Sequence, residues 1–190
     1  LDGRGVTAQA LITSTRTLEI TGRISTPEPP LKLHLFVATP RRNPMEQMLR
    51  QCAEVGVWSI TPVVTERSVA LPPRESAPER WETILQEGCK QSRNPFLPQL
   101  HTAIRFNELL ERVRDGAAPA FFGAPGAGQE PFPADAADLR WIVGPEGGLS
   151  PDEEARLTDA GARACRIGRW IMRVETAAVC GAALFLHARL

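Results

Sequence analysis

Apolar residues recur at two different spacings along this chain. In residues 6–12 and 18–24 they alternate with polar residues, and a polar segment at 13–16 separates the two runs. Alternation is typical of half-buried strands, so the pattern predicts a β-hairpin. Because two strands alone are barely stable, we expect the hairpin to pair with further structure. The proline-rich segment 25–30 that follows predicts a stiff linker.

Beyond residue 30, short apolar runs alternate with stretches in which apolar residues recur at helical spacing. The runs predict strands at residues 31–38, 58–64, 120–123, 140–143 and 164–167. The helical stretches lie at residues 44–55, 77–91, 106–114, 151–160 and 174–189. Strands that alternate with helices predict an α/β fold, with a mostly parallel sheet covered by helices on both faces.

The first of these helices carries clear signals at both ends. Asn43 is expected to cap it, because Pro44 suits the first helical position and Glu46 follows three residues after the cap. Gly56 is expected to end it. The face that we expect to be buried consists of Met45, Met48, Leu49, Cys52 and Ala53.

Charge and composition exclude more functions than they identify. Basic and acidic residues balance at 22 each, so net charge gives no argument for a nucleic-acid partner. Lys32 and Lys90 are the only lysines. Arginine suits bidentate phosphate contacts, although a biased genome composition also explains its excess. No apolar run reaches the roughly 18 residues that span a bilayer, and no signal-peptide pattern opens the chain.

Cysteine and histidine give no sign of a metal site. The four cysteines are scattered without a C-x-x-C motif, and the three histidines have no metal-ligand spacing. Reduced cysteines in a cytoplasmic protein are therefore expected. We also find no Ser/His/Asp set with usable spacing and no paired-carboxylate signature, so a hydrolase has no specific support.

The segment 142–177 contains the strongest candidate for a binding site. A glycine-rich segment at 144–148 leads to a helix start, where Ser150 is a good N-cap, Pro151 suits the first position and Glu153 completes a capping box. Backbone N–H groups near a helix start can hold anions or polar ligands. The segment matches neither the P-loop nor the dinucleotide-binding pattern.

A second loop, at 167–173, follows the next predicted strand and precedes the Ala-rich last helix. Loops at the ends of two strands form the usual ligand crevice of an α/β sheet. Taken singly, each feature also has a plain structural explanation. A glycine loop is often only a turn, and Glu175 near a helix start favours the helix dipole and pairs with Arg173. The residues alone thus predict an α/β domain whose ligand crevice is built from 144–148 and 167–173.

The combination of these motifs closely resembles the SPOUT class of methyltransferases, and more narrowly the bacterial 16S ribosomal RNA uracil-N3 methyltransferases. The resemblance covers residues 31–190 well and residues 1–30 loosely. In chain order, the matching segments are Glu54-x-Gly56-Val57, Pro62-x-x-x-Glu66-Arg67-Ser68, Gln91-Ser92-Arg93, Gly144-Pro145-Glu146-Gly147-Gly148 and Ile167-Gly168-x-x-Ile171-x-Arg173-x-Glu175-Thr176-Ala177.

The resemblance implies a fold and a domain division. Residues 31–190 would form a SPOUT methyltransferase domain whose sheet ends in a C-terminal deep trefoil knot. Composition does not predict such a feature, because knots are rare. Residues 1–30 would be a remnant of an N-terminal PUA-like β domain, a partial barrel hairpin with its linker, where the relatives carry a full PUA-like β-barrel.

The resemblance also implies a cofactor and partners. Members of the family bind S-adenosyl-L-methionine among the knot loops, release S-adenosyl-L-homocysteine, and act as homodimers on 16S ribosomal RNA of the small ribosomal subunit, without a metal or a membrane. Glycines there let the backbone approach the cofactor. Carried over by position, the cofactor-binding residues are Gly144, Glu146, Gly147, Gly148, Ile167, Gly168, Ile171, Met172 and Arg173.

The catalytic roles follow from the same resemblance. Uracil N3 is a poor nucleophile until its proton leaves, so a cation beside the developing anion assists methyl transfer. Arg173 is expected in that role, with Glu175 holding Arg173 or its loop. Arg93, from the same subunit or its partner, is expected to bind the uridine or its phosphate. No general base is identified.

Two alternative functions stay open at this point. A ribose 2′-O methyltransferase of the SPOUT class usually has a Ser-Leu-Asn-Val-Ser-like segment where this chain has Arg-Val-Glu-Thr-Ala at 173–177. A non-catalytic RNA-binding or ribosome-assembly factor would keep only a vestigial pocket, and the intact loops argue against it.

Overall fold

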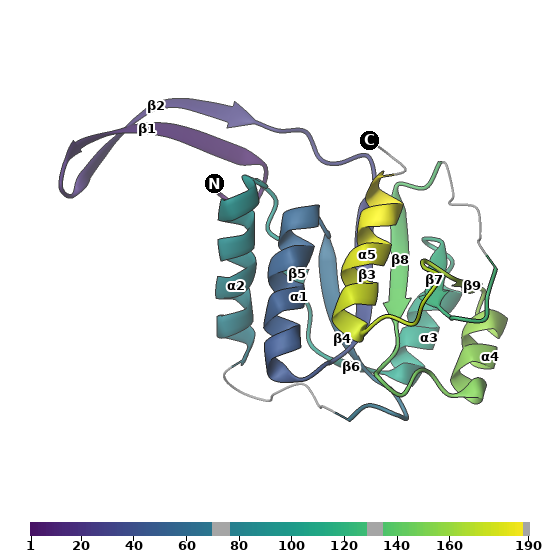
Figure 1. Cartoon of the computed structure of the whole chain (residues 1–190). Helices are drawn as coiled ribbons and strands as arrows, with labels where there is room; N and C mark the ends of the chain where they lie inside the picture. The colour runs from purple at the N-terminus through teal and green to yellow at the C-terminus, as the bar shows by residue number, and fades with distance from the viewer. Residues whose placement is uncertain (70–76, 129–134, 188–190) are drawn as a thin grey trace.

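A parallel β-sheet forms the centre of the molecule (Figure 1), a computed structural model that describes residues 1–69, 77–128 and 135–187. Its strands lie in the order β5-β4-β3-β8-β7-β9, with β6 also paired to β4. Every pair in it is parallel. The strands are β3 (Lys32–Ala38), β4 (Ser59–Val64), β5 (Gln99–Leu100), β6 (Ile104–Arg105), β7 (Ala120–Gly123), β8 (Asp138–Val143) and β9 (Arg163–Cys165).

Helices cover both faces of this sheet, as the sequence predicts. The helices α1 (Arg42–Val55), α2 (Ala77–Ser92) and α5 (Val174–His187) lie side by side on one face (Figure 1). The helices α3 (Phe106–Arg114) and α4 (Pro151–Asp159) cover part of the other face. Each face has its own buried cluster, one around Leu33, Leu35 and Trp141 and the other around Phe36, Phe122 and Ile142.

The predicted elements are confirmed, with shifts at their ends. All five predicted strands and all five predicted helices are present among the described residues. The strands β5 and β6 were not predicted, because two residues each are too few to show alternation. The strand β8 begins two residues earlier than predicted, at Asp138. Position 189, where the last helix was expected to end, lies outside the described residues.

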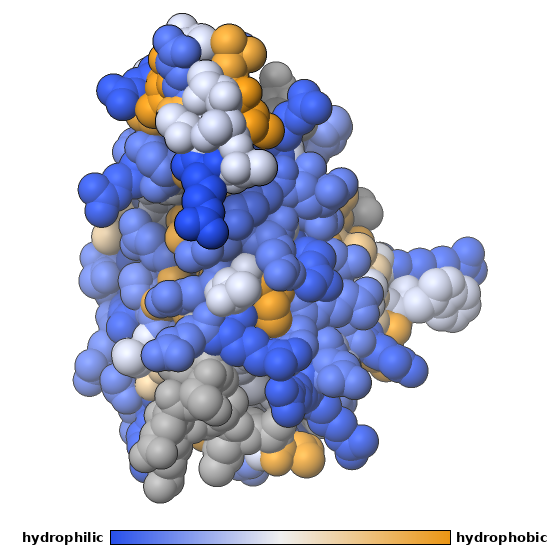
Figure 2. All heavy atoms as spheres, turned by 90° about the vertical axis from the view of Figure 1, so that its left-hand side faces the viewer, coloured by the Kyte–Doolittle hydropathy of each residue, from blue (hydrophilic) through white to orange (hydrophobic). Residues whose placement is uncertain are grey.

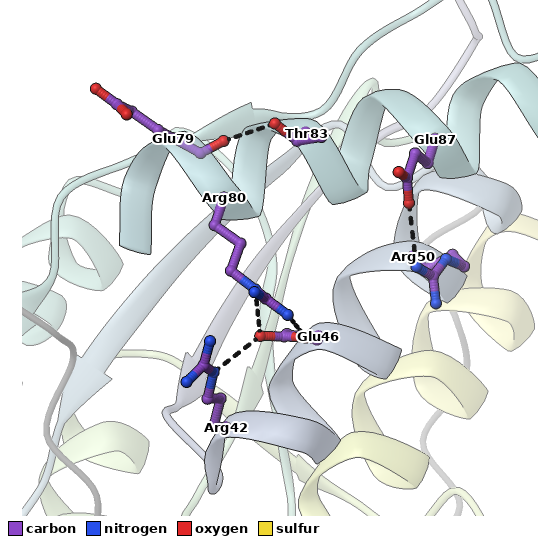
Figure 3. Close-up of polar contacts among 7 residues, drawn as sticks. All are labelled: Arg42, Glu46, Arg50, Glu79, Arg80, Thr83 and Glu87. Atoms are coloured by element: carbon purple, nitrogen blue, oxygen red, sulfur yellow. Dashed lines mark hydrogen bonds and ion pairs between the residues drawn. The ribbon is translucent and has the colours of Figure 1, made fainter. Parts of the chain in front are cut away.

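The predicted cap of α1 is wrong. The helix already begins at Arg42, so that Asn43 lies inside it, and the residue at the N-cap, Arg41, makes no side-chain cap. Glu46 has another use: it accepts hydrogen bonds from Arg42 and Arg80, the latter at 2.7 and 2.8 Å (Figure 3). The Arg80 guanidinium holds the pKa of Glu46 below its ordinary value. This carboxylate therefore ties α1 to α2 instead of capping α1.

The predicted hairpin forms a separate sheet. Strands β1 (Val6–Ser14) and β2 (Thr17–Ser25) pair with each other, and no other described strand joins them. The hairpin reaches away from the rest of the molecule (Figure 1) and is fixed at its base by backbone hydrogen bonds to residues 95–97. Its apolar side chains gather in orange above a mostly hydrophilic face in Figure 2. The exposed ones are Leu11, Ile12, Leu18, Ile20 and Ile24.

The last helix packs very closely on the sheet. Gly181 of α5 faces the Trp141 ring on β8, and a side chain at this position would collide with the ring. The Trp141 Nε1–H donates to the carbonyl of Ala177 at 3.2 Å. These contacts fix the start of α5 at the edge of the sheet where β8 ends. No helix in the described part of the chain is long and apolar enough to cross a membrane.

Candidate active site

A pocket of about 340 Å³ lies at the carboxyl edge of the sheet, beyond the ends of β7, β8 and β9. Its floor is apolar and includes Trp141, Val143 and Cys165. Its walls are residues 144–149 and 166–172, which largely coincide with the two loops that the sequence predicted at 144–148 and 167–173. This volume is within the range of small-molecule sites, and the carboxyl edge is where α/β sheets usually bind their ligands.

The first loop is held by its own backbone and by α4. The Gly148 N–H donates to the carbonyl of Pro145 at 2.8 Å, and Gly148 has a positive φ of 70° that favours glycine. The predicted capping box is confirmed: the Ser150 N–H donates to Glu153 at 3.0 Å, and the Glu153 N–H donates to the Ser150 hydroxyl at 3.3 Å. A side chain at Gly144 would lie 2.9 Å from the Leu149 side chain, so glycine is required there too.

The free donors of this loop are available to a ligand. Among the residues that the structure describes, the amide N–H groups of Glu146, Gly147 and Leu149 make no hydrogen bond. Two carboxylates, Glu146 and Glu154, and two guanidinium groups, Arg166 and Arg169, belong to residues that line the same pocket. A helix start alone would favour a simple anion. Because carboxylates and guanidinium groups both line this pocket, it suits a ligand that carries both charges.

The second loop combines a fixed entrance with an exposed tip. The Arg166 N–H donates to the carbonyl of Gly128 at 3.1 Å. Met172 folds back so closely that a side chain at Gly168 would collide with its methyl group. Between these points Trp170 and Ile171 are 76% and 84% exposed, and the Arg169 guanidinium lies 5.1 Å from the centre of the Trp170 ring.

The structure brings together eight of the nine predicted cofactor residues. Arg173, the ninth, is exposed and does not line the pocket, although it directly follows the lining residue Met172. Glu175, in the first turn of α5, is half-buried and also lies outside the lining. The eight that line the pocket are Gly144, Glu146, Gly147, Gly148, Ile167, Gly168, Ile171 and Met172.

Arg93 does not lie at this pocket in the single chain. It follows α2, and its neighbour Asn94 lines a separate small cavity with residues 29–31, just before β3 begins. It is therefore at the opposite, amino edge of the sheet. Its φ of 60° is the only positive value of a non-glycine residue in the described parts of the chain.

Two residues of the site have no recognisable signal in the sequence. Trp141 forms the pocket floor and bonds the start of α5, but in the sequence it is only one apolar residue of a buried strand. Arg67 donates to the carbonyls of Gly147 and Leu149 from 80 and 82 residues away. Only the family resemblance of the segment around Arg67 pointed to this turn.

A serine, a histidine and an aspartate meet elsewhere in the molecule. His34 Nδ1 lies 2.7 Å from the Ser59 hydroxyl, and His34 Nε2 lies 2.8 Å from the Asp138 carboxylate. The three residues lie on neighbouring strands β4, β3 and β8, which no spacing along the chain reveals. Ser59 is only 2% exposed, so it is not presented as a nucleophile. The cluster is a polar link between strands.

Metal-ligating side chains do not cluster in the described residues. No group of three or more histidine, cysteine, aspartate or glutamate side chains is arranged to hold a metal ion there. Burial raises the pKa of Cys52 to about 12 and that of Cys89 to about 11, so both remain neutral thiols.

Known proteins similar to this chain are RNA methyltransferases. The ribosomal RNA small subunit methyltransferase E of Synechocystis is 30% identical over 159 residues, which are 79% of this chain and 51% of the relative. The enzyme of the same name from Aquifex aeolicus is 29% identical over 166 residues, 85% of this chain and 71% of the relative. The chain thus spans about half the length of the Synechocystis relative.

Solved structures similar to this chain include rRNA methyltransferases as well. A ribosomal RNA small subunit methyltransferase E from Neisseria gonorrhoeae, bound to S-adenosyl methionine, superposes with a TM-score of 0.85 at 26% identity, covering 98% of this chain and 80% of that one. A probable rRNA-methyltransferase from Porphyromonas gingivalis gives 0.82 at 26% identity, covering 99% and 82%. Residues 27–186 match the RNA methyltransferase domain family. The chain therefore belongs to the RNA methyltransferase domain family.

Proposed function

We propose that this chain transfers a methyl group from S-adenosyl-L-methionine to N3 of a specific uridine in 16S ribosomal RNA of the small subunit. The observation that carries the proposal is the pocket itself, because two loops separated in sequence converge on it with eight of the nine expected cofactor residues. The names of the relatives from Synechocystis and Aquifex aeolicus support the choice of small-subunit RNA as substrate.

The residues of the pocket fit this cofactor. S-adenosylmethionine carries a carboxylate, an ammonium and a positively charged sulfur, and it supplies the methyl group on that sulfur. The carboxylates of Glu146 and Glu154 suit its cationic groups, and Arg166 suits its carboxylate. The free amides of the 144–149 loop are donors for the adenine edge, over the apolar floor around Trp141.

The chain's own residues then act on the uridine. Removal of the N3 proton leaves negative charge on the base, and Arg173 is the proposed cation that stabilises it. Arg173 suits this role because it is exposed at the point where the second loop leaves the pocket. Glu175 orients Arg173 or its loop from the first turn of α5. Alignment of N3 with the methyl group of the cofactor further raises the rate of methyl transfer.

A homodimer completes the proposal. The exposed apolar residues Trp170, Ile171 and Leu184 lie on the second loop and on α5. The helix α5 is rich in apolar residues along its whole length, although only part of it is buried, which favours a covered outer face. In such a dimer the partner's copy of Arg93 is the one proposed to bind the uridine or its phosphate. Analytical ultracentrifugation of the chain and of its Ile171→Ser variant tests the dimer.

The knot and the domain division belong to the same proposal. After β9, at the edge of the sheet, the chain passes β7 and β8 to reach the position of α5 over β3 and β8. We propose that this return path at the carboxyl edge forms the deep trefoil knot that the family resemblance implies. We further propose that residues 1–30 belong to a PUA-like β domain and that residues 31–190 are the SPOUT domain, acting in the cytoplasm.

The test is methylation in vitro of small ribosomal subunits that lack the mark, with mass mapping of the modified nucleoside. We expect 3-methyluridine at one position, and naked 16S RNA is compared as substrate in parallel. A methyl group on ribose would identify a 2′-O methyltransferase instead. Absence of product together with absence of cofactor binding in calorimetry would identify a non-catalytic RNA-binding or ribosome-assembly factor.

A further inference from the structure

The turn at residues 65–68 contacts the first pocket loop, at residues 144–149. This turn follows β4, whereas the loop at 144–149 follows β8, and β3 lies between these two strands. The contacts between turn and loop therefore pass over the end of β3. Strand pairing alone does not bring the two segments together, so side chains must hold them.

Arg67 makes the first of these contacts. Its Nη1 donates to the carbonyl of Gly147 at 3.1 Å and lies 3.4 Å from the carbonyl of Leu149. The stem of the same side chain lies against Gly147, because a Cβ built on this glycine would be 3.5 Å from the Cβ of Arg67. The stem of the arginine thus runs along the loop with room for ordinary van der Waals contact.

These bonds complete the fixation of two peptide groups. In the peptide between residues 147 and 148, the carbonyl accepts from Arg67 and the N–H of Gly148 donates to Pro145. In the peptide between residues 149 and 150, the carbonyl accepts from Arg67 and the N–H of Ser150 donates to Glu153. Both ends of each peptide group are bonded, so neither can rotate without breaking a hydrogen bond.

Glu153 makes a second connection between the same segments. One of its carboxylate oxygens accepts from Ser150, while the other accepts from the backbone N–H of Glu66 at 2.9 Å. Glu153 is only 3% exposed, so these bonds are shielded from water. The turn 65–68 is therefore attached to the loop both through Arg67 and through the buried Glu153.

From this geometry we infer that Arg67 is a positioning residue for the methyl donor. Together with the Glu66–Glu153 bond, it holds the 144–149 loop in the shape that leaves the amides of Glu146, Gly147 and Leu149 free for the cofactor. The inference rests on the proposed function, since it takes S-adenosylmethionine as the ligand of this pocket. Arg67 itself is not a lining residue, so it acts through the loop.

The expected consequence is a loss of affinity and not of chemistry. Without Arg67 the loop samples other shapes, and the apparent dissociation constant rises by the inverse of the fraction of molecules that remain competent to bind. Once the cofactor is bound, the loop is in its working shape again. The turnover number at saturating cofactor should therefore change little.

The test uses Arg67→Met, which keeps the stem against Gly147 and removes every donor. Arg114→Met is the matched control, because Arg114 is an exposed arginine of α3 whose side chain makes no hydrogen bond or ion pair among the described residues. Calorimetry with S-adenosylhomocysteine and with S-adenosylmethionine measures affinity, and thermal unfolding without ligand measures folding. Arg67→Lys, which keeps a single cationic donor, tests partial rescue.

We expect Arg67→Met to bind the cofactor about tenfold more weakly, equivalent to about 1.4 kcal/mol. Arg67→Lys should lie between Arg67→Met and the wild type, and Arg114→Met should match the wild type. Amide hydrogen exchange of residues 145–149 should accelerate in Arg67→Met while the unfolding midpoint stays unchanged. Affinity within twofold of the wild type in Arg67→Met would overturn the inference. A wild-type chain that binds no cofactor would instead overturn the proposed function.

Discussion

The two loops of the pocket differ in how they are held. The loop at 144–149 is held by Arg67, Glu153 and its own backbone, through the carbonyls of residues 145, 147 and 149 and the amides of residues 148 and 150. The loop at 166–173 has a backbone bond near each end, and in the described structure no side chain hydrogen-bonds to its middle. Its tip exposes Trp170 and Ile171. One wall is thus preorganised, whereas the other presents side chains outward.

This difference suggests a division of tasks. A loop that is bonded on the side away from its ligand loses little entropy on binding, which suits a cofactor bound in every reaction cycle. A loop with exposed apolar and cationic groups suits a large partner that arrives from solvent, such as RNA or a second subunit. Substitutions in the first loop should therefore change cofactor affinity, and substitutions at the exposed Trp170 and Arg173 of the second loop should change turnover or assembly.

The largest effect is expected for Arg173→Ala in the second loop. Loss of a cation beside the developing anion should lower turnover by about 100- to 1000-fold, while cofactor affinity changes by less than about threefold. Single-turnover methylation of small subunits and calorimetry separate the two quantities. Arg114→Ala serves as the control for loss of one exposed arginine. Wild-type turnover of Arg173→Ala with cofactor bound would refute the assigned role.

In the first loop, Gly144→Ala should weaken cofactor binding by about 30-fold or more. The new Cβ would lie 2.9 Å from the Leu149 side chain and 3.1 Å from its amide nitrogen, so the loop must move away. A shift of this kind costs about 2 kcal/mol or more where the neighbours are backbone atoms. Gly126→Ala is the control, since nothing lies within 4 Å of that position. Calorimetry that finds equal affinities for the two variants would show that the loop adapts.

Gly181 packs against Trp141, which forms the pocket floor. Gly181→Ala should lower the free energy of unfolding. The added methyl group would collide with the buried Trp141 ring, and such overpacking costs about 1–3 kcal/mol. Denaturant unfolding measures the loss. The Trp141–Ala177 hydrogen bond also fixes the start of α5, so cofactor affinity should fall along with stability. A variant as stable as the wild type would mean that α5 shifts freely on the sheet.

The smallest effect is expected far from the pocket, at Glu46. Its folded-state pKa is lowered, chiefly by the hydrogen bonds from Arg80, so its contribution to stability is present above its ordinary pKa and disappears as pH falls through the lower, folded-state value. Glu46→Gln should therefore be slightly less stable than the wild type near pH 7, and this difference should shrink as the pH is lowered into the acid range. Unfolding measured across this pH range tests the sign. Cofactor affinity should not change at neutral pH.

Features that depend on a few neighbouring residues, such as helix caps and buried helix faces, were mostly predicted from the sequence. The capping box at Ser150 and Glu153 needs only four consecutive residues and is present as predicted. The buried face of α1 follows from helical spacing alone. The cap at Asn43 failed because Glu46 pairs with Arg80 of another helix, and a contact between helices outweighs a weak local preference.

Contacts across the sheet could not be predicted in this way. The meeting of His34, Ser59 and Asp138 depends on strand order, and the contact of Arg67 with Gly147 depends on two loops that strand pairing does not join. The sequence also offered no reason to separate Arg173 from the lining of the pocket. In the structure Arg173 is exposed and lies outside the lining, although Met172 before it and Val174 after it belong to the lining.

By itself, the sequence determined the alternation of strands and helices, the two loops, and eight of the residues that line the pocket. Hydrophobic periodicity and capping act over a few residues, so they can be read along the chain. Only the tertiary structure decided the strand order, the separation of Arg93 from the pocket, and the attachment of the 144–149 loop to the turn at 65–68. These depend on packing between segments that lie far apart in sequence, where side-chain shape and hydrogen bonding decide which surfaces meet.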